Sequence, residues 1–328
     1  MALATSTNVV GNREQITDDL TLLEPETTPI LSMAKKSKAS ATFPEWQMDD
    51  LKEVSFNGVN EGEDVSVFEN KAANRARQGN YIQKFRQPWM VSDIQELVAT
   101  AGVTSEVARS ESKALREIKR DIESALGSDQ EMQADNGGGS PYKLRGLGKW
   151  IQSTAQAINP VAERYRTPAA SIDATAMASV TEDTINGVLE SRYTQVGSAG
   201  DKMYLIAGPK LKRAITDFSR ASDSTYRVTE QAGDNKITLN VKQYEGDFGT
   251  VYIVPSMFVG RTSDSDSTAA SLRRGYLLTN DLIEVPVLKA ESSTRLEDEG
   301  GGKRGFCDVI VSLCVKNPLG LGKFAATS

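Results

Sequence analysis

The chain has 328 residues, of which 39% are hydrophobic and 25% are charged, a composition typical of a folded protein with room for two domains. Its formal net charge of -6 disfavours a protein whose task is to grip nucleic-acid phosphates. The absence of histidine excludes serine–histidine and cysteine–histidine catalytic pairs and histidine-ligated zinc sites.

No membrane or export segment is predicted. The longest apolar stretch, Val309–Val315, is far shorter than the roughly 20 residues that cross a bilayer. The N-terminus lacks a basic start followed by an apolar run, so no signal peptide is expected. We therefore expect the protein to be made and assembled in the cytoplasm.

The first 40 residues predict an arm rather than a domain. Asn12–Leu23 predicts at most one short helix, and Pro25 and Pro29 predict extended chain after it. We expect such an arm to lie against its own core or against a neighbouring subunit, because an isolated arm has little to hold it in place.

Residues 41–91 predict a β-hairpin with a long connection. Two strand-like limbs, Ala41–Met48 and Asn80–Val91, flank a stretch of 28 residues from Leu51 to Gln78 that is interpreted as polar. Loops of that length are uncommon in compact domains and are usually functional. We expect the aromatic side chains of the limbs to pack across strands rather than to stack on bases, namely those of Trp46, Tyr81, Phe85 and Trp89.

The charges of this hairpin are sorted along the chain. Residues 45–69 hold eight acidic residues and one base, whereas residues 71–86 hold five bases and no acid. Two compatible hypotheses follow: the limbs neutralise each other in a solvated hairpin, or the hairpin docks on opposite charges of a neighbouring subunit. The candidate inter-subunit contact residues are Trp46, Asp49, Asp50, Glu53, Glu61, Glu63, Asp64, Glu69, Lys71, Arg75 and Arg77.

The next segment contains the strongest helix pattern of the chain. Ser92–Gln95 fits a capping box and predicts a short helix that ends at Gly102. In Thr104–Leu126, apolar residues recur three and four apart, and only Glu111 interrupts the stripe. These 23 residues predict one spine of about 35 Å, and the lack of a second long helix argues against a helical bundle.

The remainder predicts α+β structure. Helices are expected at Thr181–Gln195 and Pro209–Phe218, and a loop at Glu291–Gly305. Strands are expected at Met203–Ala207, Ile237–Tyr244, Thr250–Val254, Gly275–Thr279, Ile283–Leu288 and Phe306–Val315. Cys307 and Cys314 lie seven apart on the last of these strands and hence on opposite faces, so we expect two buried thiols without a disulfide.

No motif predicts catalysis, a cofactor or a metal. Gly146–Lys149 is followed by Trp150 and lacks the spacing of a phosphate loop, and Ser263–Asp266 lacks the glycine and distant glutamate of an EF-hand loop. The paired carboxylates Asp49/Asp50 and Glu297–Glu299 lie in stretches expected to be exposed. We therefore expect a structural protein without enzymatic activity or cofactor.

In order, these elements are an arm, a long charged β-loop, a spine helix, an α+β middle and a terminal strand, which resembles the Hong Kong 97-type capsid fold. Several stretches are more specifically similar to a family of tailed-phage major head proteins once catalogued as a domain of unknown function. They are Gly11–Glu14 with Leu20, Thr28–Leu31, Ala41-Thr42, Glu45–Gln47, Asp50-Leu51, Gly79–Tyr81, Lys119–Glu123, Arg145–Trp150, Gly208–Arg213 and Asp247–Val251.

The resemblance implies a domain plan. It assigns residues 1–40 to an N-terminal arm, 41–91 to an extended loop (E-loop), and 92–145 to a peripheral (P) domain with the spine helix at about 104–127. Residues 146–272 would form an axial (A) domain, and residues 273–328 would return to the P domain with a long C-terminal strand.

The resemblance also implies a function. Subunits would assemble as hexamers and pentamers into an icosahedral head around double-stranded DNA, with E-loops lying over neighbouring subunits. Separate scaffolding, portal and decoration proteins are implied partners, since no long helical scaffolding segment precedes the arm. No lysine–asparagine cross-linking site is identified.

Three alternatives stay open. An encapsulin-like compartment would share the fold and differ in particle size and nucleic-acid content. A tail or adaptor component would assemble with ring or tube symmetry. An enzyme with carboxylate-bound Mg²⁺ would need convergent acids on rigid elements, whereas the acids here cluster in the hairpin connection.

Overall fold

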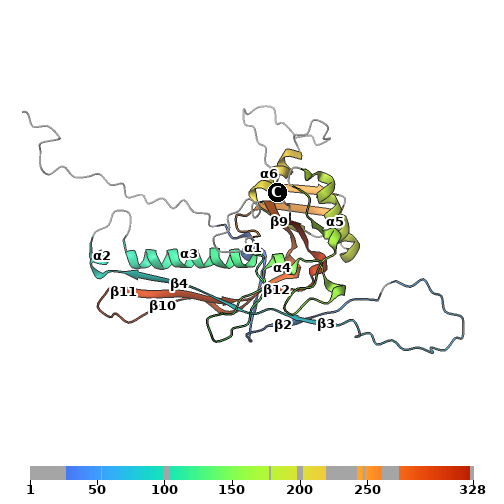
Figure 1. Ribbon diagram of the computed structural model, residues 1–328, viewed down its shortest axis with the longest axis horizontal. Helices are drawn as coiled ribbons and strands as arrows, with labels where there is room; N and C mark the ends of the chain where they lie inside the picture. Colours follow the sequence, from blue (N-terminus) through green and yellow to red (C-terminus); the bar gives the residue numbers. More distant parts are fainter. Residues whose placement is uncertain are drawn as a thin grey trace, which may run out of the picture. The chain divides into compact units, whose positions relative to one another are not determined.

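A computed structural model describes residues 27–52, 54–98, 104–176, 179–197, 202–218, 242–246, 248–260 and 273–325 (Figure 1). The predictions for Asn12–Leu23 and Ser263–Asp266, and most of the strand predicted at Ile237–Tyr244, lie outside these residues. No helix within these ranges has both the length and the apolar character of a membrane span.

The chain forms two compact units. The first contains Arg86–Ile118 and Glu291–Asp308, and the second contains the described residues of Thr27–Phe85, Lys119–Ala290 and Val309–Ser328. The division falls within helix α3 (Glu106–Leu126) and within strands β4 (Gln83–Val91), β10 (Ile283–Arg295) and β11 (Lys303–Val311).

In the first unit, α3 runs along β4 and β11 (Figure 1). Most of its predicted apolar stripe is confirmed, because Val107, Ile118, Ile122, Ala125 and Leu126 are buried, whereas Leu115 is only half-buried and the unpredicted Ala114 is buried beside it. Glu111, which interrupts the stripe, lies 3.4 Å from the guanidinium of Arg295. Compared with the predicted helix Thr104–Leu126, α3 begins two residues later, at Glu106, and ends at the same residue.

Helix α2 (Asp93–Leu97) precedes α3 and corrects the capping prediction. The Ser92 side chain makes no capping hydrogen bond, and the helix ends at Leu97 rather than Gly102. Glu96 instead accepts hydrogen bonds from Ser105 Oγ at 2.8 Å and from the Val107 backbone N–H at 3.1 Å. Glu96, which directly follows the predicted motif, therefore caps the following helix, a tertiary contact that local spacing does not reveal.

The first unit also contains a hairpin made by the ends of β10 and β11. Leu296 N–H donates to the Arg304 carbonyl at 2.9 Å, so pairing continues through residues predicted as a loop. The prediction of a loop over Glu291–Gly305 is wrong at both ends, because the ladder supplies backbone partners whatever the polarity of the side chains.

One sheet has the strand order β1-β10-β11-β4, where β1 is Lys35–Lys38, and β12 (Cys314–Val315) also pairs with β10. The predicted single strand Phe306–Val315 is therefore two strands. The strand is interrupted at Ser312 and Leu313, although the Ser312 N–H still donates to the Pro286 carbonyl of β10 at 2.9 Å and its hydroxyl donates to the Tyr81 carbonyl at 3.0 Å. Both cysteines are nevertheless buried and free, as predicted.

Helix α1 (Pro29–Met33) corrects the expectation of extended chain after Pro29. Proline occupies the first turn of this helix, where the missing N–H costs nothing. The fully buried Glu123 of α3 accepts hydrogen bonds from the backbone N–H groups of Ile30 and Leu31, both at 2.9 Å. The end of the spine helix thereby fastens α1.

The second sheet has six strands in the order β5-β13-β9-β6-β8-β7. Their bounds are β5 Ile172–Asp173, β13 Gly322–Ala325, β9 Arg274–Thr279, β6 Lys202–Ala207, β8 Gly249–Pro255 and β7 Gln243–Gly246. β6 is parallel to β8 and antiparallel to β9. The strand β13 was not predicted, whereas β6, β8 and β9 match the prediction.

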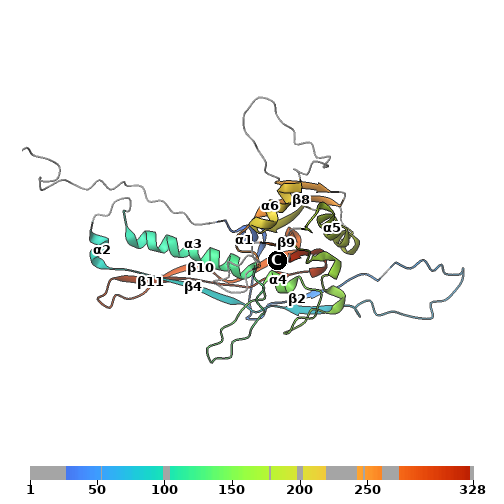
Figure 2. The same cartoon turned by 45° about the horizontal axis from the view of Figure 1, so that its top comes forward.

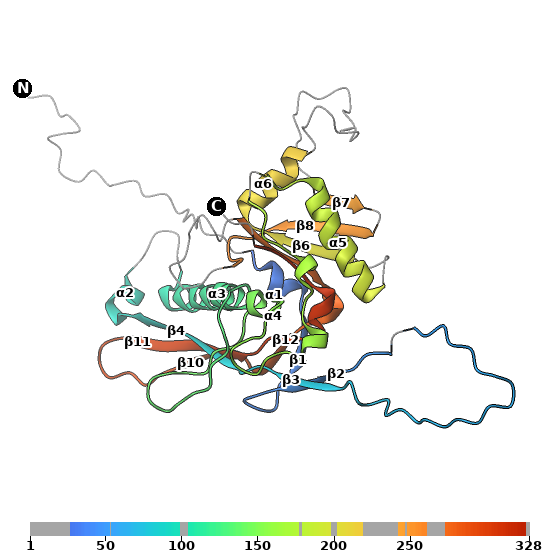
Figure 3. The same ribbon diagram turned by 45° about the vertical axis from the view of Figure 1, so that its right-hand side comes forward.

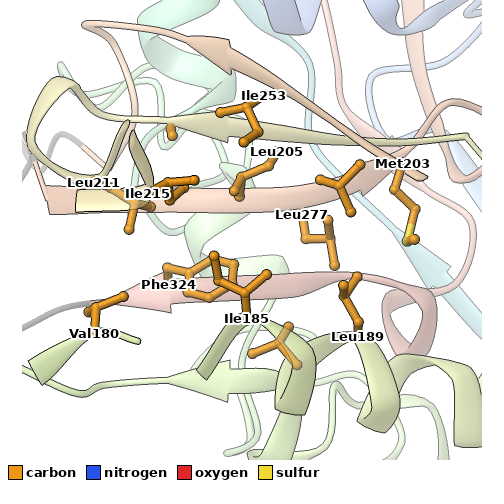
Figure 4. Packing of buried hydrophobic residues seen from close by; sticks show 13 residues of the cluster. Val180, Ile185, Leu189, Met203, Leu205, Leu211, Ile215, Ile253, Leu277 and Phe324 are labelled. Carbon is orange, nitrogen blue, oxygen red and sulfur yellow. The ribbon is translucent and has the colours of Figure 1, made fainter. Parts of the chain in front are cut away.

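Helices α5 (Glu182–Val196) and α6 (Pro209–Phe218) confirm the two predicted helices and cover one face of this sheet (Figures 2 and 3). Met203, Leu205 and Ala207 alternate along β6 and enter one apolar cluster with Leu189 of α5 and Leu211 of α6 (Figure 4). Ile206, Tyr276 and Leu278 are buried on the opposite face, so the centre of the sheet is enclosed on both sides.

The remaining elements are short. They are β2 (Glu45–Met48), β3 (Ala76–Gly79), helix α4 (Leu147–Trp150), and 3-10 turns at Glu163–Tyr165, Ala169–Ser171, Asn280–Leu282 and Pro318–Gly320.

Candidate functional site

The predicted hairpin exists, but its stem differs from the prediction. β2 pairs antiparallel with β3 from Glu45↔Gly79 to Met48↔Ala76, whereas Gln83–Val91 belongs to the sheet with β11. The change of sheet follows the fully buried Asn80, whose side chain donates to the Leu313 carbonyl at 2.8 Å and accepts from the Arg145 N–H at 2.7 Å. The buried asparagine ends the stem and redirects the chain.

The aromatic residues of the limbs pack within the protein. The Trp46 ring lies 5.5 Å from that of Trp150, and the Tyr81 ring lies 4.6 Å from that of Phe43. Phe85 and Trp89 are buried on β4. The rings thus pack against other side chains of the protein, but the partner of Trp46 lies on helix α4 (Leu147–Trp150) and not on a facing strand, so the prediction of packing across strands is wrong for Trp46.

The base of the connection is anchored to residues that sequence reasoning did not single out. Asp50 forms an ion pair with Arg164, and the Tyr165 hydroxyl donates to the Asn74 carbonyl at 2.7 Å. The same hydroxyl oxygen lies 3.3 Å from Oδ1 of Asp50. Burial, followed by the nearby negative charge of Asp50, raises the pKa of Tyr165. Asp50 and Asn74 are therefore held at the two ends of the connection.

Between these anchors the chain projects from the stem (Figure 3). We call residues 49–75 the projecting loop. Two pairs join the acidic and the basic limb, as the first charge hypothesis requires: Arg75 lies 3.2 Å from Asp49, and Arg77 of the stem pairs with Glu45. Glu69 contacts Lys52, the one base of its own block, and Lys71, which lies two residues further along the chain. The two lysines lower the pKa of Glu69.

Three acids near the tip of the projecting loop are different. Glu61, Glu63 and Asp64 make no ion pair with any residue that the structure describes. Glu63 accepts only local hydrogen bonds from the backbone and side chain of Asn60, at 3.2 and 3.0 Å. Glu53, another predicted contact residue, lies outside the described residues. The tip thus keeps uncompensated negative charge.

The projecting loop also exposes apolar side chains. Phe56 is 97% exposed, Leu51 91% and Phe68 85%. Val54, Val59, Val65 and Val67 are exposed as well. A single exposed apolar residue is ordinary, but seven on one loop are a concentration suited to burial against another molecule.

Sequence reasoning missed this surface because the connection was treated as polar. A signal was present: Val54-Ser55-Phe56 and Val65-Ser66-Val67 alternate apolar and polar residues in the manner of a strand. The missed anchors Arg164 and Tyr165 gave no such signal, since they lie 90 or more residues further along the chain.

The segment Arg145–Trp150 has a packing role. The fully buried Arg145 lies 2.6 Å from Glu131 and stacks 4.9 Å from the centroid of Trp150, and burial lowers the pKa of its guanidinium. A side chain at Gly148 would overlap the carboxylate of Asp129. Because this backbone is enclosed by the protein's own side chains, nothing in it supports phosphate binding.

Other candidate chemistry finds no support in the described chain. No group of three or more cysteine, aspartate and glutamate side chains in those ranges is arranged to hold a metal ion. Of the acids at 297–299, Glu299 pairs with Arg304 at 2.6 Å.

Comparison with known proteins gave one family and many structural neighbours. The family model described as "SU10 major capsid protein" matches residues 3–328. No curated protein sequence matches the chain significantly.

Three solved structures illustrate the likeness of fold. A capsid structure of the cyanophage P-SCSP1u has 12% sequence identity and a TM-score of 0.61, covering 96% of this chain and 93% of its own. The capsid of an empty GTA particle has 10% identity and a TM-score of 0.62, covering 99% and 98%. The bacteriophage PhiM1 mature capsid has 10% identity and a TM-score of 0.59, covering 99% and 95%.

These neighbours confirm the expected α+β capsid fold of the Hong Kong 97 type. The alternative of an encapsulin-like compartment is not favoured, because the family and these neighbours are phage and GTA capsids.

Proposed function

The chain belongs to the SU10 major capsid protein family, and we propose that its subunits interlock through the projecting loop. The protein is a structural component of a phage-type capsid. In the proposal, each projecting loop lies over a neighbouring copy, and the copies form the hexamers and pentamers of an icosahedral head.

One observation carries this proposal: the projecting loop exposes seven large apolar side chains that its own chain does not cover. Burying a fully exposed valine, leucine or phenylalanine contributes about 1.5–3 kcal/mol, so leaving all seven in water in the working state would forgo a large stabilisation. The anchors at Asp50 and Asn74 support the same view, since they present the loop outward from a fixed base.

The domain plan belongs to this proposal. Residues 1–40 act as the arm, 41–91 as the E-loop, 92–145 and 273–328 as the P domain, and 146–272 as the A domain. The contact residues Trp46, Asp49, Asp50, Glu69, Lys71, Arg75 and Arg77 hold the stem and limbs in shape, while Glu53, Glu61, Glu63 and Asp64 meet the neighbour.

The proposal also names the partner proteins and the place of assembly. Separate scaffolding, portal and decoration proteins take part in head formation in the host cytoplasm, and the shell lies close to packaged double-stranded DNA without reading its sequence. The protein has no enzymatic activity in this proposal.

The test removes apolar surface from the projecting loop. Phe56→Ser combined with Phe68→Ser is expected to leave the far-UV circular dichroism and unfolding midpoint of the unassembled subunit unchanged, because neither ring is buried in its own chain. The yield of shells, counted by negative-stain electron microscopy, should fall at least tenfold.

The matched control is Met257→Ser, a half-exposed apolar residue outside the projecting loop, which should assemble normally. Shells formed by the double variant at the control's yield would refute docking through the loop. Rings or tubes in place of closed shells would point to a tail or adaptor component.

A further inference from the structure

Part of the projecting loop has the properties of a strand without a partner. In Asp64–Glu69, Val65 and Val67 fall on one face, and valine and phenylalanine favour strands. No backbone N–H or C=O group of this segment has a hydrogen-bond partner among the described residues. An extended segment of this kind is suited to join the open edge of a sheet.

The second unit contains such an edge at β1. This strand stands at the end of its sheet and pairs only with β10, in parallel, from Lys35↔Glu284 to Lys38↔Val287. On its other side, its backbone groups have no partner within the described chain. Lys35, Lys36 and Lys38 are exposed, and Lys35 pairs with Asp281.

Charge distinguishes β1 from the other described edge strands. Lys36 and Lys38 make no ion pair within the described residues, and neither do Glu61, Glu63 and Asp64 at the loop tip. The edges β5 and β7 carry the acidic residues Asp173 and Glu245, and β4 is interrupted by Pro88, which cannot donate to a ladder. Of the remaining edges, β2 carries Glu45, the single base of β3, Arg77, already pairs with Glu45, and β12 (Cys314–Val315) carries no charge. Among the described edge strands, β1 therefore offers the most basic uninterrupted edge to an acidic strand.

The partner is a second copy of the chain. The projecting loop leaves its stem on the side away from the β1 of its own chain (Figure 3), so it does not turn back to that edge. A neighbouring copy in a shell presents the same edge.

We propose that Asp64–Glu69 of one subunit adds as a strand to the open edge of β1 in a neighbouring subunit, where Glu61, Glu63 and Asp64 meet Lys36 and Lys38. This inference rests on the proposed docking of the projecting loop and names its receiving surface. Backbone pairing supplies the affinity, and the charges set the partner and the register.

The competing explanation is that the lysines only protect an exposed edge from wrong pairing, a common role of lysine in edge strands. In that case their charge could be reversed without loss, because glutamate protects an edge equally well.

The experiment is a charge exchange with rescue. Lys36→Glu with Lys38→Glu, and separately Glu63→Lys with Asp64→Lys, should each lower the shell yield at least tenfold. The variant that combines all four changes should recover at least half of the wild-type yield. Lys202→Glu with Lys210→Glu, two exposed lysines elsewhere in the second unit, is the matched control and should assemble normally.

Backbone pairing has its own readout. Hydrogen exchange of the amides of residues 65–69 should be at least tenfold slower in shells than in unassembled subunits. Ser66→Pro, which removes one donor and no charge, should also lower the yield.

The outcomes separate this inference from the proposed function. The pairing with β1 would be overturned if both charge-reversal variants failed to assemble and the combined variant did not recover. It would also be overturned if the amides of residues 65–69 exchanged as fast in shells as in unassembled subunits. Normal shells from Lys36→Glu with Lys38→Glu, with or without a loss of packaged DNA, would overturn it too. Docking through the loop itself fails only if the Phe56 and Phe68 variant also assembles normally.

Discussion

Glu123 is a fully buried carboxyl group with a raised pKa. It lies at the buried end of α3 and accepts two backbone hydrogen bonds from the first turn of α1. Burial raises its pKa to about 7, although the two hydrogen bonds favour the charged form. A carboxyl group in this state ties the beginning of the described chain to the spine helix and makes that tie depend on pH.

The sign of the pH dependence of stability follows from the linkage between proton binding and folding. A carboxyl group with a higher pKa in the folded state favours folding fully below its unfolded pKa of 4.5, and this contribution is lost as the pH rises through about 7. We expect the free energy of unfolding to fall by at most about 3 kcal/mol between pH 5 and pH 8 through this group.

The measurement is urea unfolding of the unassembled subunit at pH 5 and pH 8. Glu123→Gln should remove this part of the pH dependence while lowering stability at both values, since an amide accepts only one of the two hydrogen bonds well. Glu190→Gln, on the exposed side of α5, is the control and should keep the wild-type slope. An unchanged slope in Glu123→Gln would contradict the assignment.

At Gly148 the neighbouring residues leave no space for a side chain. The Asp129 carboxylate, which a side chain at this position would overlap, accepts a hydrogen bond from Lys323 at 2.9 Å and pairs with Arg274. Lys323 also donates to the Gly148 carbonyl at 2.9 Å. These contacts join the loop after α3 to strands β9 and β13.

Gly148→Ala is therefore expected to destabilise the subunit by about 3 kcal/mol or more, because it displaces a buried ion-pair network. The matched change is Gly187→Ala in the middle of α5, where a new side chain meets no atom within 4 Å. There alanine should stabilise by about 0.5–1 kcal/mol through its better helix propensity. Denaturant midpoints of the two variants should move in opposite directions, and a shift in the same direction would contradict this account.

At the scale of elements, the sequence predicted the helices and strands that local periodicity determines. It missed the helix cap and the redirection of the chain that long-range contacts determine. The apolar stripe of α3 and the buried run of β6 are local patterns, and both elements formed as expected. The cap of α3 by Glu96 and the redirection of the chain at Asn80 depend on residues distant in sequence or on tertiary hydrogen bonds. Such contacts leave no periodic trace.

The errors in the strands have the same origin. The predicted last strand is interrupted at Ser312, where the hydroxyl donates to the Tyr81 carbonyl, although the side chains on either side continue a strand-like pattern. β13 is only four residues long and gains its place by pairing with β9 and β5. Pairing partners, not propensity, decided where these strands begin and end.

For the candidate site, the charges were predicted and the apolar surface was not. Sorting of acids and bases along residues 45–86 predicted a hairpin with paired limbs, and Asp49–Arg75 and Glu45–Arg77 are such pairs. The exposed phenylalanines Phe56 and Phe68 lie in a stretch rich in charged and polar residues, so its composition concealed them. Only the solvent exposure of the folded chain showed them as an uncovered surface.

At the scale of the whole molecule, the projecting loop is separable from the fold that presents it. Between Asp50 and Asn74 it makes no hydrogen bond or ion pair with the rest of the described chain. A subunit in which residues 51–73 are replaced by Gly-Ser-Gly should keep its stem, its anchors and its unfolding free energy to within about 0.5 kcal/mol. We expect it to form no shells in negative-stain electron microscopy.

Assembly of truncated subunits mixed with wild-type subunits tests the role of the projecting loop further. A truncated subunit can still receive a neighbour's loop but has none to offer, so each copy that enters a shell leaves one neighbour uncovered. Adding one truncated subunit to every four wild-type subunits should therefore lower the yield of closed shells by more than one fifth, whereas the same amount of a wild-type subunit denatured beforehand should not. Shells built from truncated subunits alone at wild-type yield would show that the loop's apolar surface is dispensable for assembly.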